Sequence, residues 1–238
     1  MKTMNPTTLP VSGVVLGASL LPMSQAVAEE VSVSANIGVV SNYMWRGLSQ
    51  TNDGAAVQGG LDLSMGGFYA GTWASNVDFG DDDVADNQTE VDVYLGYDFS
   101  LTMEEASLGV NAIYYAYPDD STLDFAEIGV SGGYGVVSAG IQYTFWTDAG
   151  GDDAHLYYSL GLDFALPQDF SMSPYFGYYD FDGWSDSDCF HYGLGISKDA
   201  GDFGSFGINV DKIDPKTDAS YSDSQKKTKF WVSWSKEF

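Results

Sequence analysis

The sequence predicts an all-β protein, a transmembrane antiparallel up-and-down β-barrel of about twelve strands. Three observations predict this fold. From residue 29 onward apolar and polar residues alternate in segment after segment, long polar connections alternate with tight ones, and a secretory signal pattern precedes both. The composition agrees, with 28 glycines, 16 tyrosines and 14 phenylalanines among 238 residues. No apolar run reaches the roughly 18 residues that a membrane helix needs, so helical spans are excluded.

Residues 1–28 are expected to be a signal peptide that is removed from the mature protein. Lys2 provides a basic start, Val11 to Leu21 is an apolar run of 11 residues, and Ala26-Val27-Ala28 has the small-x-small pattern that signal peptidase recognises. We therefore expect cleavage after Ala28. Residues 29–238 then form the outer-membrane β-barrel.

Alternation identifies the strands in order. In the first segment, valine, alanine and isoleucine occupy the odd positions from 31 to 39, and serine, asparagine and glycine lie between them. Most of the segments have the length that crosses a bilayer at a tilt. The twelve expected strands are Val31 to Val39, Val57 to Leu63, Phe68 to Val77, Val91 to Phe99, Leu108 to Tyr117, Asp124 to Tyr134, Val136 to Trp146, Leu156 to Phe164, Ser171 to Phe181, Phe190 to Ile196, Ser205 to Lys212 and Thr228 to Phe238.

The odd-numbered and the even-numbered connections between these strands differ in length. The odd-numbered ones are mostly long and polar: Gly47 to Gly54, Asp78 to Gln88, Pro118 to Leu123, Thr147 to Ala154, Asp182 to Ser187 and Ile213 to Lys227. The even-numbered ones are mostly tight: Gly66-Gly67, Ser100 to Glu105, Gly135, Pro167 to Phe170 and Asp199 to Gly204. An outer-membrane barrel has short periplasmic turns and longer outward loops, whereas a soluble β-sandwich has no reason for this sorting.

The two faces of the strands also differ from those of a soluble protein. Glycine and serine dominate the polar face, where they would weaken a solvent-exposed strand but would leave room in a lumen. Aromatic residues gather at strand ends, as in interfacial belts. They are Tyr43, Trp45, Phe68, Tyr97, Phe99, Tyr114, Phe145, Phe164, Phe190 and Phe230. A soluble barrel with an aromatic core remains the alternative.

The last segment carries an assembly signal. Phe230, Val232, Trp234 and the final Phe238 share one face, which resembles the terminal strand by which outer-membrane proteins are recognised. Lys236 departs from the fully apolar version. The expected partners are therefore the barrel assembly machinery, through this strand, and the lipid and lipopolysaccharide of the outer membrane.

Part of the chain is similar to the TorF family of putative porins. The similarity lies in the segments Ser41 to Thr51, Val57 to Asp62 and Gly67 to Phe79, and it is dense over residues 36–80. This resemblance implies a proteobacterial outer-membrane barrel that acts as a porin. Such families usually have an arginine where Arg46 stands, but Met44 departs from their pattern.

The distribution of charge predicts a passive channel for small hydrophilic solutes or ions that favours cations. The chain has 34 acidic and 9 basic residues, and neither lysine nor arginine occurs between Arg46 and Lys198. Carboxylates in a lumen stabilise cations and destabilise anions. The expected lumen-lining residues are Arg46, Asp62, Asp92, Asp98, Glu127, Asp163 and Asp211. We place Arg46 at the outer end of the first strand, where it pairs with one of these acids.

Other functions remain possible from the sequence. Inward-facing rings, namely Tyr69, Trp73, Tyr94, Tyr115, Tyr157, Tyr175 and Tyr179, could instead fill a narrow bore. The alternative is thus a non-conducting barrel whose acidic loops bind a partner or divalent cations. We expect no cofactor, no resident metal and no nucleic-acid partner, because an acidic surface repels phosphate. An enzyme is not expected either. The chain has two histidines, His155 and His191, but no G-x-S-x-G elbow that would present a nucleophilic serine.

Overall fold

The computed structural model describes residues 31–79, 88–103, 105–148, 154–181, 187–217 and 221–238. The expected signal peptide therefore lies outside the described residues, as do most of the aspartates in the second loop. The described helices are single 3-10 turns, and none has the length or hydropathy of a membrane-crossing helix.

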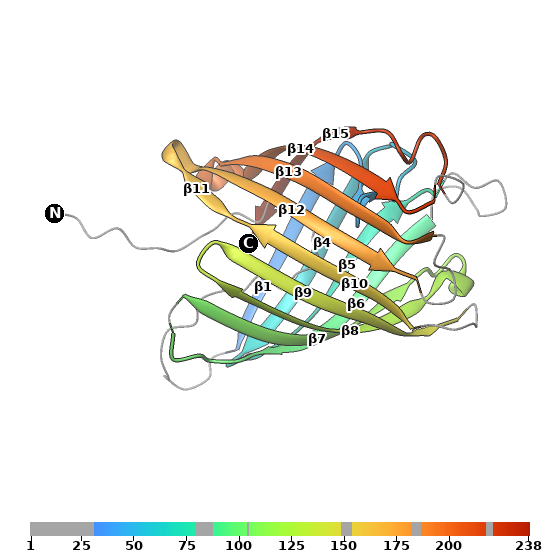
Figure 1. The fold of residues 1–238 in the computed structure, drawn as a ribbon. Coiled ribbons are helices and arrows are strands. Elements are labelled where there is room, and N and C mark those ends of the chain that lie inside the picture. Colours follow the sequence, from blue (N-terminus) through green and yellow to red (C-terminus); the bar gives the residue numbers. More distant parts are fainter. Residues whose placement is uncertain (1–30, 80–87, 104, 149–153, 182–186, 218–220) are drawn as a thin grey trace.

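The chain forms one closed antiparallel barrel of twelve strands (Figure 1). Two short strands, β2 (Met44–Trp45) and β3 (Leu48–Ser49), form a separate hairpin. The barrel strands are β1 (Ser32–Val40), β4 (Ala56–Met65), β5 (Phe68–Val77), β6 (Gln88–Asp98), β7 (Ala106–Ala116), β8 (Phe125–Tyr134), β9 (Val137–Thr147), β10 (His155–Leu162) with its continuation β11 (Phe164–Leu166), β12 (Phe170–Asp180), β13 (Cys189–Asp199), β14 (Ser205–Pro215) and β15 (Lys229–Glu237). All twelve expected strands are confirmed.

Each strand pairs with its neighbours in the sequence, and the last strand closes the barrel on the first. β1 pairs with β15 from Asn36 opposite Glu237 to Val40 opposite Ser233. The amide of Phe238 also donates to the carbonyl of Ala35 at 2.8 Å. Because the wall is closed, each of its twelve described strands has a partner on both sides.

The connections confirm the predicted alternation of long and tight connections along the chain. Gly66-Gly67, Gly135-Val136 and the 3-10 turns η2 (Pro167–Asp169) and η4 (Gly201–Phe203) lie at one end, which we call the turn end. Gly66 and Gly135 have φ of 61° and 59°, a left-handed conformation that glycine adopts without strain. The long connections leave and rejoin the strands at the opposite end, which we call the loop end. It includes η1 (Ser121–Leu123).

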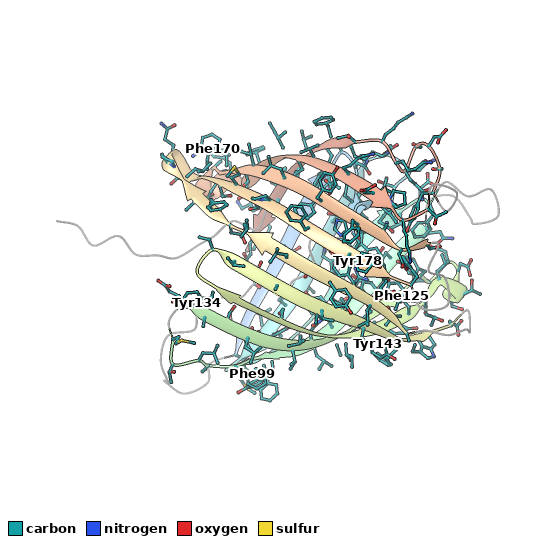
Figure 2. The ribbon with its side chains drawn as sticks, in the orientation of Figure 1. Phe99, Phe125, Tyr134, Tyr143, Phe170 and Tyr178 are labelled. Carbon is teal, nitrogen blue, oxygen red and sulfur yellow. The ribbon has the colours of Figure 1, made fainter. Side chains whose placement is uncertain are left out.

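The barrel is apolar outside and polar inside. Large apolar side chains such as Val33, Leu61 and Ile208 are more than half exposed, whereas Asp92 and Glu127 are completely buried. A soluble protein has the opposite distribution. In Figure 2, Phe99, Tyr134 and Phe170 lie towards the turn end, and Tyr143 and Tyr178 lie nearer the loop end. The outward-facing aromatic residues therefore gather towards both ends, as a pair of interfacial belts requires.

Residues 41–55, which follow the first strand, do not continue it outward as the predicted place of Arg46 at its outer end implied. β1 ends at Val40, and the chain then turns back into the barrel before β4 begins at Ala56. We call residues 41–55 the inserted segment. Its Tyr43 is buried, and Trp45 packs against Tyr115 and Tyr179 of the inner wall. The prediction that Tyr43 and Trp45 belong to an outer aromatic belt is therefore wrong, because both rings face the lumen.

Candidate pore and its closure

The inserted segment is folded by its own polar side chains. Ser49 donates to the Asn42 side chain and accepts from the Asp53 amide, while Asn42 donates to the Asp53 carboxylate at 2.9 Å. Lys229 at the start of β15 forms an ion pair with Asp53 at 2.5 Å. Burial would raise the pKa of Asp53, but its contact with Lys229, helped by Asn42 and Ser224, lowers that pKa. The base of the segment is thus fixed to the barrel rim.

Arg46 lies at the tip of the inserted segment and not at the end of the first strand, where the sequence placed it. It stands in the β2–β3 turn with φ of 48° and is followed by Gly47 with φ of 82°. A Cβ at Gly47 would lie 2.5 Å from Cβ of His191 and 2.6 Å from Ile213. The turn therefore needs a glycine both for its conformation and for its contact with the wall.

The predicted pairing of Arg46 with a lumen acid is present in the structure. Its Nη1 and Nη2 donate to Oε1 and Oε2 of Glu127 at 2.9 and 2.6 Å, and both side chains are buried. The guanidinium also lies over three rings, 4.2 Å from Trp45, 4.1 Å from Tyr157 and 4.8 Å from Tyr179. A planar cation suits both the paired carboxylate and the rings.

A second contact fixes the segment to another part of the wall. The Tyr43 hydroxyl donates to Glu90 of β6 at 3.0 Å, and the Tyr117 hydroxyl donates to the same carboxylate at 3.3 Å. The Tyr43 ring packs edge-on against Trp73 of β5. The inserted segment therefore contacts lumen-facing side chains on strands from β5 round to β14, so it occupies the loop half of the lumen.

The predicted lumen residues take different environments. Asp211 is buried and accepts from Trp231 Nε1 at 2.6 Å and from the Tyr175 hydroxyl. Asp62 is half-buried and accepts from the Tyr94 hydroxyl. The predicted residues thus do not form one ring. They lie at several levels of the barrel.

Asp92 is completely buried in the loop half, and the other two acids lie towards the turn end. Asp98 is half-buried at the end of β6. Asp163 is exposed between β10 and β11, where it interrupts the strand and accepts from Ser173 at 2.8 Å. Lumen-facing side chains of this turn half, including Ser64, Ser131 and Ser159, are also only partly buried. The inserted segment fills the loop half, whereas the turn half combines these partly buried side chains with the buried Ser171 and Ser197.

Sequence reasoning missed two features of the site. Glu90 lies on the inward register but one residue before the expected start of its strand, and extending the alternation back from Asp92 would have found it. The inserted hairpin has strands of two residues each, too short to show alternation. His191 packs in the lumen, where it stacks on Tyr157 and shares a 2.9 Å hydrogen bond with the Tyr157 hydroxyl.

No cluster of three or more histidine, cysteine, aspartate or glutamate side chains could hold a metal ion among the described residues. The aspartates at 81–83, 86, 152, 153, 182 and 186 lie outside the described ranges.

The fold is similar to that of solved porins. A structure of the KdgM porin matches with a TM-score of 0.59 and 11% identity, covering 86% of this chain and 99% of that one. A KdgM porin in complex with disordered oligogalacturonate matches with a TM-score of 0.56 and 8% identity, covering 87% and 97%. At these identities the likeness concerns the fold alone.

Sequence comparison identifies the family. No curated protein matches the chain. The matches do not name the TorF putative porins, so that more specific resemblance stays a prediction. A family described as a bacterial protein of unknown function, Gcw_chp, matches residues 24–238. Because this match covers almost all of the chain, the protein belongs to the Gcw_chp family.

Proposed function

We propose that the protein is an outer-membrane channel for the passive diffusion of small hydrophilic solutes or ions, with a preference for cations. The barrel would span the outer membrane of a Gram-negative cell with its loop end outward. The apolar exterior, the polar interior and the porin fold support the location. No catalytic role is proposed.

One observation carries the cation preference. Four carboxylates in the lumen, those of Glu90, Asp92, Glu127 and Asp211, are almost completely buried, and the only buried cation among the described lumen residues is Arg46. Fixed negative charge in a narrow lumen lowers the free energy of a cation and raises that of an anion. An acidic oligosaccharide, such as the oligogalacturonate in the KdgM complex, would therefore be disfavoured here.

The inserted segment closes the loop half in this conformation, so conduction requires that it move. The wall does not depend on the segment, because Val40 pairs directly with Ala56. A two-residue Asn-Gly turn can join two such strands. Replacing residues 41–55 with Asn-Gly should therefore keep the barrel and remove its closure.

Planar-bilayer recordings test this proposal. We expect the shortened barrel to show a larger and steadier conductance than the full chain, with a reversal potential that indicates cation preference near 0.1 M salt, where the Debye length is about 10 Å. Replacing Asp92 and Asp163 with Asn should weaken that preference. Anion preference, or no change in these variants, would contradict the assigned lumen.

A matched control shortens a different loop. Asp98 pairs with Gly109, so residues 99–108 can likewise be replaced with Asn-Gly. This change is made at the turn end of β6 and β7, and it leaves the inserted segment and its partners Glu90 and Glu127 untouched. This variant should conduct like the full chain, because the closure described above lies in the loop half.

The non-conducting barrel is the second candidate function. Dense packing of the loop half favours it, since Tyr115, Tyr157, Tyr179 and Trp231 are all buried beside the inserted segment. In that case the acidic loops would bind a partner or divalent cations. A shortened barrel that is folded but carries no current would support this candidate over the channel.

A further inference from the structure

Asp92 is the most unusual side chain in the lumen. It is completely buried, and neither of its carboxylate oxygens has a hydrogen-bond partner among the residues that the structure describes. The other three buried carboxylates differ, because Glu90, Glu127 and Asp211 each accept bonds from neighbouring side chains. Burying a carboxylate without a partner is strongly unfavourable, so some group that compensates Asp92 is expected.

The described residues around Asp92 provide no such group. It lies opposite Trp73 of β5 and Tyr115 of β7 in the two strand registers. The acids that act on it electrostatically are Glu90, two residues earlier on the same face of β6, and Glu127 of β8. Both are negative, so they add to the unfavourable field at Asp92.

Arg46, the buried cation of the described lumen residues, is already engaged elsewhere. Both terminal nitrogens of Arg46 donate to Glu127, and its faces lie against aromatic rings. The Glu90 carboxylate is held by two tyrosine hydroxyls, which are neutral donors. With its three carboxylates ionised, the group formed by Arg46, Glu90, Asp92 and Glu127 has three negative charges and one positive charge. Two negative charges are thus left without a counter-charge.

We propose that a monovalent metal cation, Na⁺ or K⁺, binds in the loop half of the lumen against Asp92, with Glu90 adding a second negative charge. A divalent ion is less suited, because no three acidic or imidazole side chains converge among the described residues and such ions prefer several carboxylate ligands. The role of this ion in conduction rests on the proposed function, whereas its binding does not.

Thermal unfolding of the whole barrel in detergent tests the proposal without any measurement of current. A ligand that binds only the folded state raises its stability with concentration. We expect a higher unfolding temperature in NaCl or KCl than in choline chloride at equal ionic strength. Because general screening is the same in the three salts, this difference reports specific binding of the metal ion.

Variants assign the effect to Asp92. Asp92→Asn should remove the difference between the salts, and Glu90→Gln should reduce it if Asp92→Asn does not fold. Asp62→Asn is the matched control, because Asp62 is a lumen acid with a tyrosine partner and should leave the difference intact.

Three results would overturn the proposal. The first is an equal unfolding temperature of the unmodified chain in all three salts, and the second is a salt difference that survives in Asp92→Asn. The third is an Asp92→Asn barrel that is more stable by the same amount in every salt, which would identify a proton as the compensating group. A barrel that conducts no current but shows the salt difference retains the site and loses only the channel.

Discussion

Arg46 and Glu127 matter for the stability of the barrel mainly because neither can be removed without leaving the other as an unpaired buried charge. Both side chains are buried, and each would leave an uncompensated charge if the other were removed. Breaking such a pair costs about 3–5 kcal/mol, whereas replacing both partners with apolar residues can be almost neutral. The pair therefore fixes where the inserted segment lies in the lumen.

A double-mutant cycle checks this dependence. We expect Arg46→Met and Glu127→Met each to lower the free energy of unfolding by about 3–5 kcal/mol, and the double variant to lose much less than their sum. Urea unfolding from lipid vesicles, followed by tryptophan fluorescence, measures all three. Additive losses would show that the two side chains act independently.

Tyrosine rings cover glycines of the neighbouring strands on the inner wall. A Cβ at Gly71 would lie 2.6 Å from Cζ and Oη of Tyr94, and the Tyr94 hydroxyl donates to Asp62. The ring therefore cannot move aside without losing that bond. The polar face of the strands uses glycine because of these rings, in agreement with the expectation that glycine leaves room for side chains in the lumen.

Gly71→Ala should accordingly destabilise the barrel by about 1–3 kcal/mol through overpacking. Gly140→Ala is the control, because the one close contact of a Cβ there is the Ser159 hydroxyl at 2.9 Å, which can rotate at the loss of only a long 3.4 Å hydrogen bond to the Gly140 carbonyl. Both free energies of unfolding are measured in the same lipid. Equal effects at the two positions would contradict the role given to Tyr94.

In two hairpins of the barrel an aspartate at the loop end accepts the same pair of hydrogen bonds. Asp124 accepts from the Tyr117 amide and the Tyr114 hydroxyl, seven and ten residues earlier. Asp188 accepts from the Phe181 amide and the Tyr178 hydroxyl at the same spacings. Three residues after each aspartate stand Glu127 and His191, which both reach the inserted segment. The two loops therefore anchor the strands that hold Arg46.

Asp188, the second of these aspartates, makes the stability of the barrel depend on pH. Burial would raise the pKa of Asp188, but the Phe181 amide and the Lys216 ammonium outweigh it and lower that pKa below the ordinary value of 3.8. A depressed pKa in the folded state adds stability above the ordinary pKa, and this stability is lost as the pH falls through the folded value.

Lys216→Met should raise the pKa of Asp188 and move this acid loss to higher pH. Stability measured by urea unfolding between about pH 6 and pH 2 reports the shift. Lys198→Met, which removes the pair with Asp169 at the turn end, is the control. An unchanged acid profile in Lys216→Met would assign the low pKa to the Phe181 amide and the Tyr178 hydroxyl instead.

At the scale of the element, the strands could be predicted and the inserted segment could not. A strand that lies between lipid and lumen must alternate, so its sequence reports its position. Residues 41–55 instead pack in the lumen through long-range contacts, such as Arg46 with Glu127, 81 positions apart. Such contacts leave no local period. The inward register still predicted that Arg46 would meet an acid.

The whole molecule is polarised along its axis, with long loops at one end and tight turns at the other. We expect a cysteine at Ser121, exposed at the loop end, to react with an impermeant maleimide on whole cells, and one at Thr102, exposed at the turn end, to remain unmodified. The native Cys189 is buried, so the unmodified chain provides the background. The opposite labelling would reverse the topology proposed for the membrane.

The pairing of β1 with β15 also bears on how the barrel forms. It joins Asn36 to Glu237, so almost the full length of the described chain separates the two partners. Contacts of such high sequence separation are slow to form, because the loop they close costs entropy before it gains any bond. β1 must therefore wait with one side unpaired while ten other strands are made and placed. During that interval its open hydrogen-bonding edge is a site for aggregation, and the barrel depends on protection until its final strand arrives.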